Sequence, residues 1–415
     1  MSKKTTKFFL TLTGILGLTQ LFATEIYPFY LERQDGTVLE GYFSPPSTSG
    51  APIIFAIQGS SCESVLGWHK SLSDQASALG LGVIALEKQG ISREGIDLFA
   101  YSQTNCLQNR FEDYVACLAN AHFICPGWEG KPIFWGESEG GMLAASLAGQ
   151  TPETAAVLLF GAGGGMKPRE EVKWVLQHRL EKQGTMQDEI DEYMSFLDEQ
   201  MDAMILDPAP EKQFLGNTYK WWASFLAAEE AAAPLNQHSL PICLIHGAKD
   251  SQIPVVSADL AAEGLAKTNA LTYLRLEGYG HDLDTADVHD ATSRWLASVL
   301  FGEEPSEGIL IAQAALPAST SLENAQTDMS GYIFNRGKNK DKGEGDGGGK
   351  GEVHGSVGGG RDSNGNESAS VDVGGSYHSD SGWNGGIDGG ASRSRDRDGN
   401  TTTEVHVEAH GGYDF

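Results

Sequence analysis

The chain has 415 residues, 40% of them hydrophobic, and a formal net charge of −27 at pH 7. This length and composition allow one large domain with a sizeable core and a few attached segments. The negative charge argues against nucleic acid as a partner, because the phosphates would be repelled. Most of the acidity lies in the body of the chain, since residues 334–415 carry 9 Lys and Arg against 14 Asp and Glu.

Residues 1–23 have the pattern of a secretory signal peptide. Lys3, Lys4 and Lys7 precede an apolar run over residues 8–22, and Ala23 offers a small residue for cleavage. The run is short for a membrane span. We therefore expect a periplasmic or secreted protein with no stable membrane span after the signal is removed. A buried N-terminal helix is the alternative.

The sequence predicts no metal and no cofactor. Its five cysteines match no metal-binding spacing, although an oxidising compartment would allow one or two disulfides, whose pairing stays open. Residues 161–167 (GAGGGMK) resemble a phosphate-binding loop, but Met166 stands where a Walker A motif requires glycine.

Residues 24–313 predict an α/β fold, with a mostly parallel central sheet flanked by helices. Short runs rich in Val, Ile, Leu and Phe alternate with amphipathic stretches, which is typical of buried strands followed by covering helices. Residues 27–33 and 37–43, joined through an Asp-Gly pair, favour an opening hairpin. The other runs lie at residues 52–58, 81–86, 132–135, 155–160, 242–246 and 271–276.

Two segments depart from this alternation. Residues 167–233 are helical in pattern, without a predicted strand, and indicate a helical cap inserted into the domain; a peripheral excursion is the alternative. Residues 334–415 are acidic, glycine-rich and of low complexity. Such a segment buries too little apolar surface to offset its chain entropy, so we expect a disordered tail, with short strands at most over residues 402–409. This tail would contact a surface.

A serine between two glycines carries the strongest chemical signal. The pattern Gly-Glu-Ser-Glu-Gly occurs once, at residues 136–140, after a predicted strand and before a predicted helix. A nucleophile elbow needs this context, because the glycines let the chain turn sharply and present the hydroxyl at the strand end. Ser138 is therefore the predicted nucleophile, and a glycine-rich turn without catalytic function is the alternative.

Two further residues complete a candidate triad. Serine needs a base, and His281 lies in a glycine-bearing loop after a predicted strand. The base needs a carboxylate, which Asp250 provides just past another strand end. Asp282, Asp284 and Asp287 are rivals, but their closeness to His281 in sequence makes the approach to its ring less natural.

An oxyanion hole is expected beside the nucleophile. One donor should be the backbone N–H of Glu139, directly after Ser138. The other should come from the loop after the strand at residues 52–58, where Gly59 lets the backbone turn and the N–H of either Ser60 or Ser61 can face the site. The residues leave the choice between these two serines open.

Together, the segments QGSS, GESEGG, HGAKD and GYGHDL, in this order and spacing, resemble the α/β-hydrolase superfamily over residues 27–302. The helical insertion resembles the cap that such enzymes often carry. Gln58 and Glu137 depart from common forms, which have histidine at the first position and histidine or tryptophan at the second. Neither departure removes a triad member.

We expect an exported serine hydrolase that cleaves an ester, thioester or amide, with a carboxylesterase as first choice. A serine peptidase or acyltransferase on the same fold is the alternative, and a non-catalytic binding protein is a third reading. The cap residues Trp221, Trp222 and Phe225 could line the substrate pocket, or simply pack. The substrate itself and the oligomeric state are left open.

Overall fold

The computed structural model describes residues 8–9, 25–33 and 35–302 and four C-terminal segments, 350–361, 367–378, 383–395 and 401–413. The chain divides into two compact units, a large one with the central sheet and a small one with the C-terminal strands. Most of the predicted signal peptide lies outside the described residues. Its residues Phe8–Phe9 form a short strand, β1, that pairs with the edge of the central sheet.

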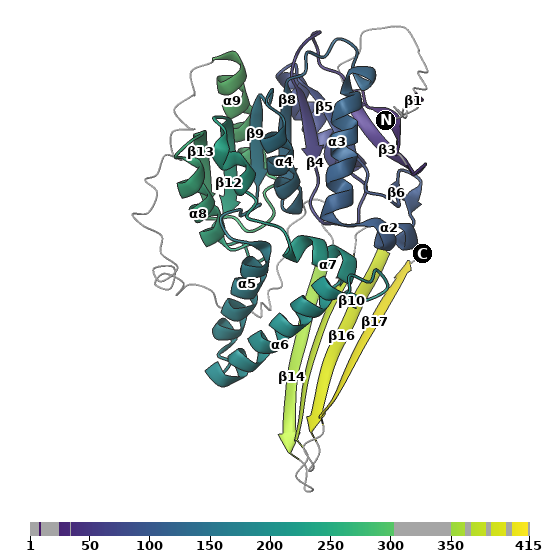
Figure 1. Ribbon diagram of the computed structural model, residues 1–415, viewed down its shortest axis with the longest axis vertical. Helices are drawn as coiled ribbons and strands as arrows, with labels where there is room; N and C mark the ends of the chain where they lie inside the picture. Colours follow the sequence, from purple (N-terminus) through teal and green to yellow (C-terminus); the bar gives the residue numbers. More distant parts are fainter. Residues whose placement is uncertain are drawn as a thin grey trace, which may run out of the picture. The chain divides into compact units, whose positions relative to one another are not determined.

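The central sheet has the order β1-β2-β3-β5-β4-β8-β9-β12-β13 (Figure 1). The strands β2 and β3 form the predicted antiparallel hairpin, β1 pairs antiparallel with β2, and β3 pairs antiparallel with β5. The pairs from β5 through β4, β8, β9 and β12 to β13 are parallel. The bounds after β1 are β2 Tyr27–Glu32, β3 Val38–Ser44, β4 Ile53–Ile57, β5 Gly82–Leu86, β8 Pro132–Glu137, β9 Ala156–Phe160, β12 Pro241–Gly247 and β13 Ala270–Leu276.

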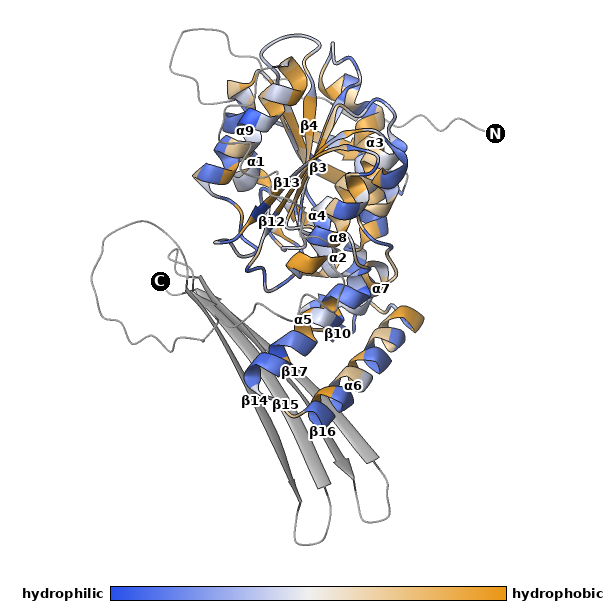
Figure 2. Cartoon of the chain, turned by 90° about the vertical axis from the view of Figure 1, so that its left-hand side faces the viewer, coloured by the Kyte–Doolittle hydropathy of each residue, from blue (hydrophilic) through white to orange (hydrophobic). Residues whose placement is uncertain are grey.

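Helices cover both faces of this sheet, which confirms the predicted fold class. Every residue of β4, β5 and β9 is buried, because side chains from alternate positions pack against helices on opposite faces. Figure 2 shows these apolar strands in the interior of the domain. One face packs against α1 (Leu66–Ala78) and α9 (Ala286–Phe301). The other packs against α3 (Leu107–Ile124), α4 (Glu139–Gln150) and α8 (Val255–Leu265).

This topology brings the candidate site together. The strands β4, β8, β9, β12 and β13 run parallel, so the loops that follow them meet at one edge of the sheet. Those loops contain the oxyanion-loop serines, Ser138, Asp250 and His281. Between β5 and α3 lie the short strands β6 (Ile91–Ser92) and β7 (Gly95–Ile96) and the helix α2 (Leu98–Thr104).

The insertion after β9 is mainly helical, as predicted. It contains α5 (Pro168–Gln183), α6 (Gln187–Leu206) and α7 (Tyr219–Leu226), and a 3-10 helix, η1 (Ala233–Gln237), leads back to the sheet. The prediction that it has no strand is wrong. The two-residue strands β10 (Gln213–Phe214) and β11 (Asn217–Thr218) pair across Leu215 and Gly216, whose φ angles of 46° and 81° close a tight turn.

In the C-terminal segment, the structure describes four strands of 12 or 13 residues that pair antiparallel in sequential order. The rest of residues 334–415, the segment whose composition predicts a disordered tail, lies outside the described residues. Backbone pairing needs no apolar side chain, so a glycine-rich polar chain can satisfy its own N–H and C=O groups. The strands are β14 Lys350–Arg361, β15 Glu367–His378, β16 Trp383–Arg395 and β17 Thr401–Tyr413.

The five cysteines are free thiols, so the structure contains none of the disulfides that an oxidising compartment would allow. All but Cys62 are buried, and burial raises the pKa of the Cys117 and Cys243 thiols. Among the helices of the described residues, none is long and apolar enough to span a bilayer.

Candidate active site

Ser138 stands on a strained turn between β8 and α4. Its φ of 52° and ψ of −124° are unusual for a residue with a side chain, and only one other non-glycine residue in the described part of the chain has a positive φ. Its N–H donates to the carbonyl of Phe160 at 2.8 Å, and its own carbonyl accepts from the N–H of Gly141 at 2.9 Å. These two bonds hold the turn in its unfavourable conformation.

The glycines of the turn are required by close approach. A Cβ on Gly136 would lie 2.3 Å from the carbonyl oxygen of Gly140, and a Cβ on Gly140 would lie 2.1 Å from that of Ile57. Both distances are far below van der Waals contact. The glycines therefore allow strand β8, helix α4 and strand β4 to meet closely at the point where Ser138 is presented.

Asp250 and His281 form a hydrogen-bonded pair. The His281 Nδ1 lies 2.7 Å from Asp250 Oδ2, and the Asp250 side chain is fully buried while that of His281 is 19% exposed. The other carboxylate oxygen of Asp250 accepts the backbone N–H groups of Gln252 at 2.8 Å and Ile253 at 3.0 Å. The carboxylate is thus fixed, and it orients the imidazole so that Nε2 is directed away from it.

The rival acids near His281 have other partners. Asp282 accepts the backbone N–H of Asp284 at 3.0 Å, and Asp284 pairs with His289 at 2.7 Å. Asp287 lies 3.4 Å from the Tyr279 hydroxyl. Of these acids, Asp250 is therefore the one hydrogen-bonded to His281, and its role as the orienting acid stays a prediction.

His281 and Ser138 lie on neighbouring parts of the same edge. A Cβ built on Gly161 would be 3.5 Å from both the Nδ1 and the Cε1 atom of His281, so the imidazole ring lies directly against this glycine. The residue before it, Phe160, accepts the N–H of Ser138. The ring is therefore next to the backbone segment that is hydrogen-bonded to the elbow.

The predicted oxyanion loop also lies against the elbow. A Cβ on Gly59 would be 3.2 Å from the Ser138 Cβ, and beyond Gly59 the chain continues through Ser60, which is half-buried, and Ser61, which is exposed. Glu139 begins helix α4, so its N–H belongs to the first turn, where N–H groups have no intrahelical partner. The residues that carry the three predicted oxyanion donors, Ser60, Ser61 and Glu139, therefore lie on the two backbone segments that meet at the elbow.

A comparison with protein families identifies the group to which this site belongs. The model of the serine aminopeptidase S33 family matches residues 60–285, more than half of the chain. The protein is a member of this family. Membership confirms the resemblance to the α/β-hydrolase superfamily and makes the protein a hydrolase.

Solved structures resemble the S33-type domain in fold. Est1E from Butyrivibrio proteoclasticus is 13% identical, with a TM-score of 0.46, and the alignment covers 66% of this chain and 99% of that one. An esterase from Pyrococcus furiosus is also 13% identical, with a TM-score of 0.46 and coverage of 66% and 91%. A puromycin hydrolase is 17% identical, with a TM-score of 0.47 and coverage of 68% and 40%. No curated protein matches the chain in sequence.

In this S33-family protein, the aromatic residues predicted to line a substrate pocket are mostly packed. Trp221 and Trp222 are buried, and Phe225 stacks on Trp221 with a centroid separation of 4.8 Å. The Trp221 indole N–H donates to Glu139 Oε2 at 2.5 Å. Cap helix α7 is therefore connected directly to the residue after Ser138. Packing accounts for these contacts, and a role in substrate binding stays a prediction.

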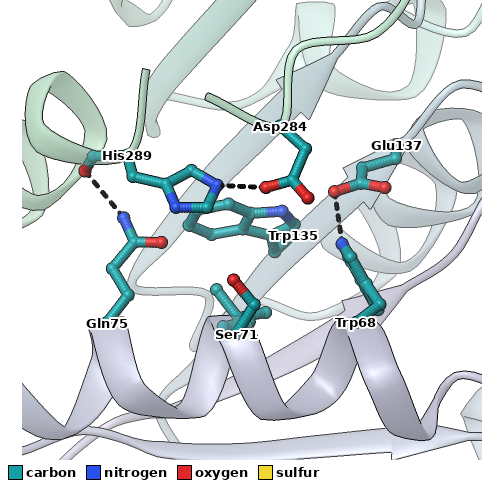
Figure 3. A pocket seen from close by; sticks show the side chains of 8 residues that line it. Trp68, Ser71, Gln75, Trp135, Glu137, Asp284 and His289 are labelled. Atoms are coloured by element: carbon teal, nitrogen blue, oxygen red, sulfur yellow. Dashed lines mark hydrogen bonds and ion pairs between the residues drawn. The ribbon is translucent and has the colours of Figure 1, made fainter. Parts of the chain in front are cut away.

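Glu137, the residue before the nucleophile, points into a small pocket between α1 and the loop before α9 (Figure 3). Its Oε1 accepts the indole N–H of Trp68 at 2.6 Å, and Asp284, paired with His289, lies nearby. Burial and, to a lesser extent, the charge of Asp284 raise the pKa of Glu137 to about 7. The other residues that line the pocket are Ser71, Leu72, Gln75 and Trp135.

This raised pKa predicts a pH-dependent stability. Between the ordinary value of 4.5 and about 7, the unfolded chain releases the Glu137 proton more readily than the native protein, so Glu137 makes the protein less stable as the pH rises through this window. The Tm of Glu137→Gln minus the Tm of the wild type should therefore increase between pH 5 and pH 8, by at least about 2 °C. Melting curves at several pH values test this. Equal gains from the exposed control Glu153→Gln would contradict it.

Sequence reasoning missed three buried polar side chains at the site. His246 is fully buried, and its Nε2 lies 3.1 Å from the carbonyl of Ile253 and 3.4 Å from Asp250 Oδ2. Arg110 forms an ion pair with Glu139, and Lys88 donates to Gln58 Oε1 at 2.6 Å. The available signal was that Lys88 lies two residues after a buried strand and that Arg110 lies on the same helix face as Leu107, Tyr114 and Cys117.

Proposed function

We propose that the protein is an exported serine hydrolase that cleaves an ester, thioester or amide through an acyl-enzyme. The observation that carries the proposal is the positive φ of Ser138, because a strained non-glycine turn between a strand and a helix presents a nucleophile and serves no evident packing purpose. The Asp250–His281 hydrogen bond supplies the base and its orienting acid.

In the proposed reaction, the Ser138 hydroxyl oxygen attacks the carbonyl carbon of the substrate while His281 Nε2 takes the hydroxyl proton. The N–H of Glu139 and that of Ser60 or Ser61 stabilise the oxyanion, near the positive end of helix α4. The carbonyl re-forms as the bond to the leaving group breaks, and the leaving group takes the proton from His281. Water then attacks the acyl carbon while His281 Nε2 takes one of its protons. The bond from the acyl carbon to Ser138 Oγ breaks, Ser138 takes that proton back from His281, and the acid is released.

A carboxylesterase remains our first choice, and a serine peptidase is the second candidate because the matched family is described as a serine aminopeptidase. Acyl transfer to another acceptor uses the same first half-reaction. A panel of p-nitrophenyl esters and aminoacyl p-nitroanilides separates the first two readings. Labelling with a fluorophosphonate probe, followed by mapping of the labelled peptide, tests the shared mechanism. An unlabelled protein that hydrolyses none of the panel would instead be a non-catalytic binding protein.

We also propose that the C-terminal segment is dispensable for chemistry and acts at a surface after export. It contributes no residue to the proposed triad or oxyanion hole, and its composition is glycine-rich and polar. A chain that ends at Gly331 should keep kcat for small soluble esters within about twofold of the full-length value. Ester kinetics, melting curves and limited proteolysis of both forms test this. A tenfold lower kcat after truncation would make the segment part of the enzyme.

A further inference from the structure

The loop after β4 is held by side chains in an unusual way. Four successive backbone carbonyls, those of residues 58–61, accept hydrogen bonds from three side chains outside the loop. Arg110 donates to the carbonyls of Gln58 and Gly59, the latter at 3.4 Å. The Tyr101 hydroxyl donates to the Ser60 carbonyl at 3.2 Å, and Lys88 Nζ donates to the Ser61 carbonyl at 2.7 Å.

Arg110 connects this loop to the elbow. Its side chain on α3 is 5% exposed, and the same guanidinium that binds the Gln58 and Gly59 carbonyls also forms an ion pair with Glu139, which follows Ser138. A guanidinium is a rigid planar fork with five donors, so it can fix three acceptors at once. One side chain thus joins the two backbone segments that contain all the proposed oxyanion donors.

Burial of the Lys88 ammonium group is unfavourable, and its hydrogen bonds to this loop offset that cost. Lys88 is 4% exposed, and within the described residues it forms no ion pair with a carboxylate; both of its hydrogen bonds go to the loop, at Gln58 Oε1 and the Ser61 carbonyl. Burial and the nearby Arg110 lower its pKa to about 7. An apolar side chain would fill this space without that cost, so the hydrogen bonds to the loop are the property that requires a lysine.

The bonds to the carbonyls determine where the amides point. In a planar trans peptide the carbonyl of one residue and the N–H of the next are directed oppositely. Arg110, by holding the Gly59 carbonyl, therefore aims the N–H of Ser60 in the opposite direction, and Tyr101 does the same for the N–H of Ser61 through the Ser60 carbonyl. The hydrogen bonds on the carbonyl side of each peptide thus fix the directions of the two candidate oxyanion donors, the N–H groups of Ser60 and Ser61.

We propose that Arg110, Lys88 and Tyr101 are positioning residues that hold the amides of the oxyanion hole in the geometry of the transition state. The inference rests on the proposed function, since it assigns a purpose to a loop that matters only if Ser138 forms an acyl-enzyme. It predicts a loss in turnover rather than in substrate binding, because these amides contact the developing oxyanion and not the ground-state substrate.

Arg110→Lys is the principal test, because it keeps the charge but loses the fork that serves three acceptors. Its kcat on a p-nitrophenyl ester should fall roughly 10- to 100-fold with KM within about twofold, since small displacements of catalytic groups cost rate in this range. A trifluoromethyl ketone, which forms a tetrahedral adduct with serine, should bind more weakly by a similar factor. Tyr101→Phe, which loses the hydrogen bond to the Ser60 carbonyl, should show a smaller fall in kcat and in affinity for the ketone.

Arg33→Lys is the matched control. Arg33 is largely buried and forms an ion pair with Asp113, which lies on the same helix as Arg110. Within the part of the chain that the structure describes, no hydrogen bond connects Arg33 to residues 58–61. Its replacement should lower Tm and leave kcat and ketone binding near wild type. Lys88→Met and Tyr101→Phe carry the test if Arg110→Lys fails to fold.

The outcomes separate this inference from the function on which it rests. If the fluorophosphonate probe labels Ser138 and the Arg110, Lys88 and Tyr101 variants lower Tm without lowering kcat, the side chains are merely structural and the inference is overturned while the function stands. If the wild-type protein is not labelled at Ser138, the proposed function fails and the positioning role fails with it.

Discussion

Ser138→Ala should lower turnover of any ester substrate by roughly 10⁴-fold or more, the scale on which loss of a triad nucleophile acts. The substitution removes the hydroxyl oxygen of the proposed nucleophile and leaves the Cβ and the backbone of the elbow in place. Fluorophosphonate labelling should disappear completely. Kinetics with a p-nitrophenyl ester and mass spectrometry of the probe-treated protein measure both effects.

The fold should survive this change. The bonds that hold the turn involve the backbone N–H and carbonyl of residue 138, which alanine retains, so Tm should stay within a few degrees of the wild type. Ser71→Ala, which changes a serine of the pocket beside Glu137, is the matched control and should keep full activity. Labelling of wild-type protein at a serine other than 138 would remove the basis for the proposed mechanism.

The sheet and the elbow could be predicted because their signals are local. A run such as residues 53–57 is apolar at every position, as expected of a strand buried on both faces. The glycines at 136 and 140 likewise indicate, from the sequence alone, a place where backbone segments come into close contact. Ser138, Asp250 and His281 could be located because each lies in a loop or turn that follows a predicted strand, and their order in the chain is the one expected on this kind of sheet.

The supporting network could not be predicted, because it depends on contacts between residues far apart in the chain. Arg110 lies 52 positions from Gln58 and 29 from Glu139, and a lone arginine on an amphipathic helix is normally solvated. For Trp221 the sequence leaves open a place in the substrate pocket or simple packing, and nothing near it in sequence reveals that its indole N–H donates to Glu139. Periodicity finds the buried face of a helix but not the partner of a particular polar atom.

The cap illustrates a second limit. A two-residue strand such as β10 has too few residues to show alternation, so only the turn through Leu215 and Gly216 reveals it. Such a short strand leaves no hydrophobic pattern in the sequence.

Asp250→Asn should reduce kcat by roughly 10⁴-fold while the protein stays folded, since an amide in place of the orienting carboxylate imposes the wrong imidazole tautomer. The Asn oxygen would keep accepting the N–H groups of Gln252 and Ile253, as Asp250 Oδ1 does. The amide nitrogen would then face His281 Nδ1, which must become an acceptor. The proton would move to Nε2, and the imidazole could no longer take the proton of Ser138.

The matched control for this prediction is Asp284→Asn. Asp284 is close to His281 in sequence, but its side chain is 61% exposed and pairs with His289 instead. Its replacement removes an exposed ion pair, which is worth at most about 1 kcal/mol, and should leave kcat unchanged. Steady-state kinetics of both variants, with melting curves to verify folding, distinguish the two acids. Near-normal turnover in Asp250→Asn together with a severe loss in Asp284→Asn would assign the orienting carboxylate to Asp284, and the hydrogen bond between Asp250 and His281 would then have no part in the reaction.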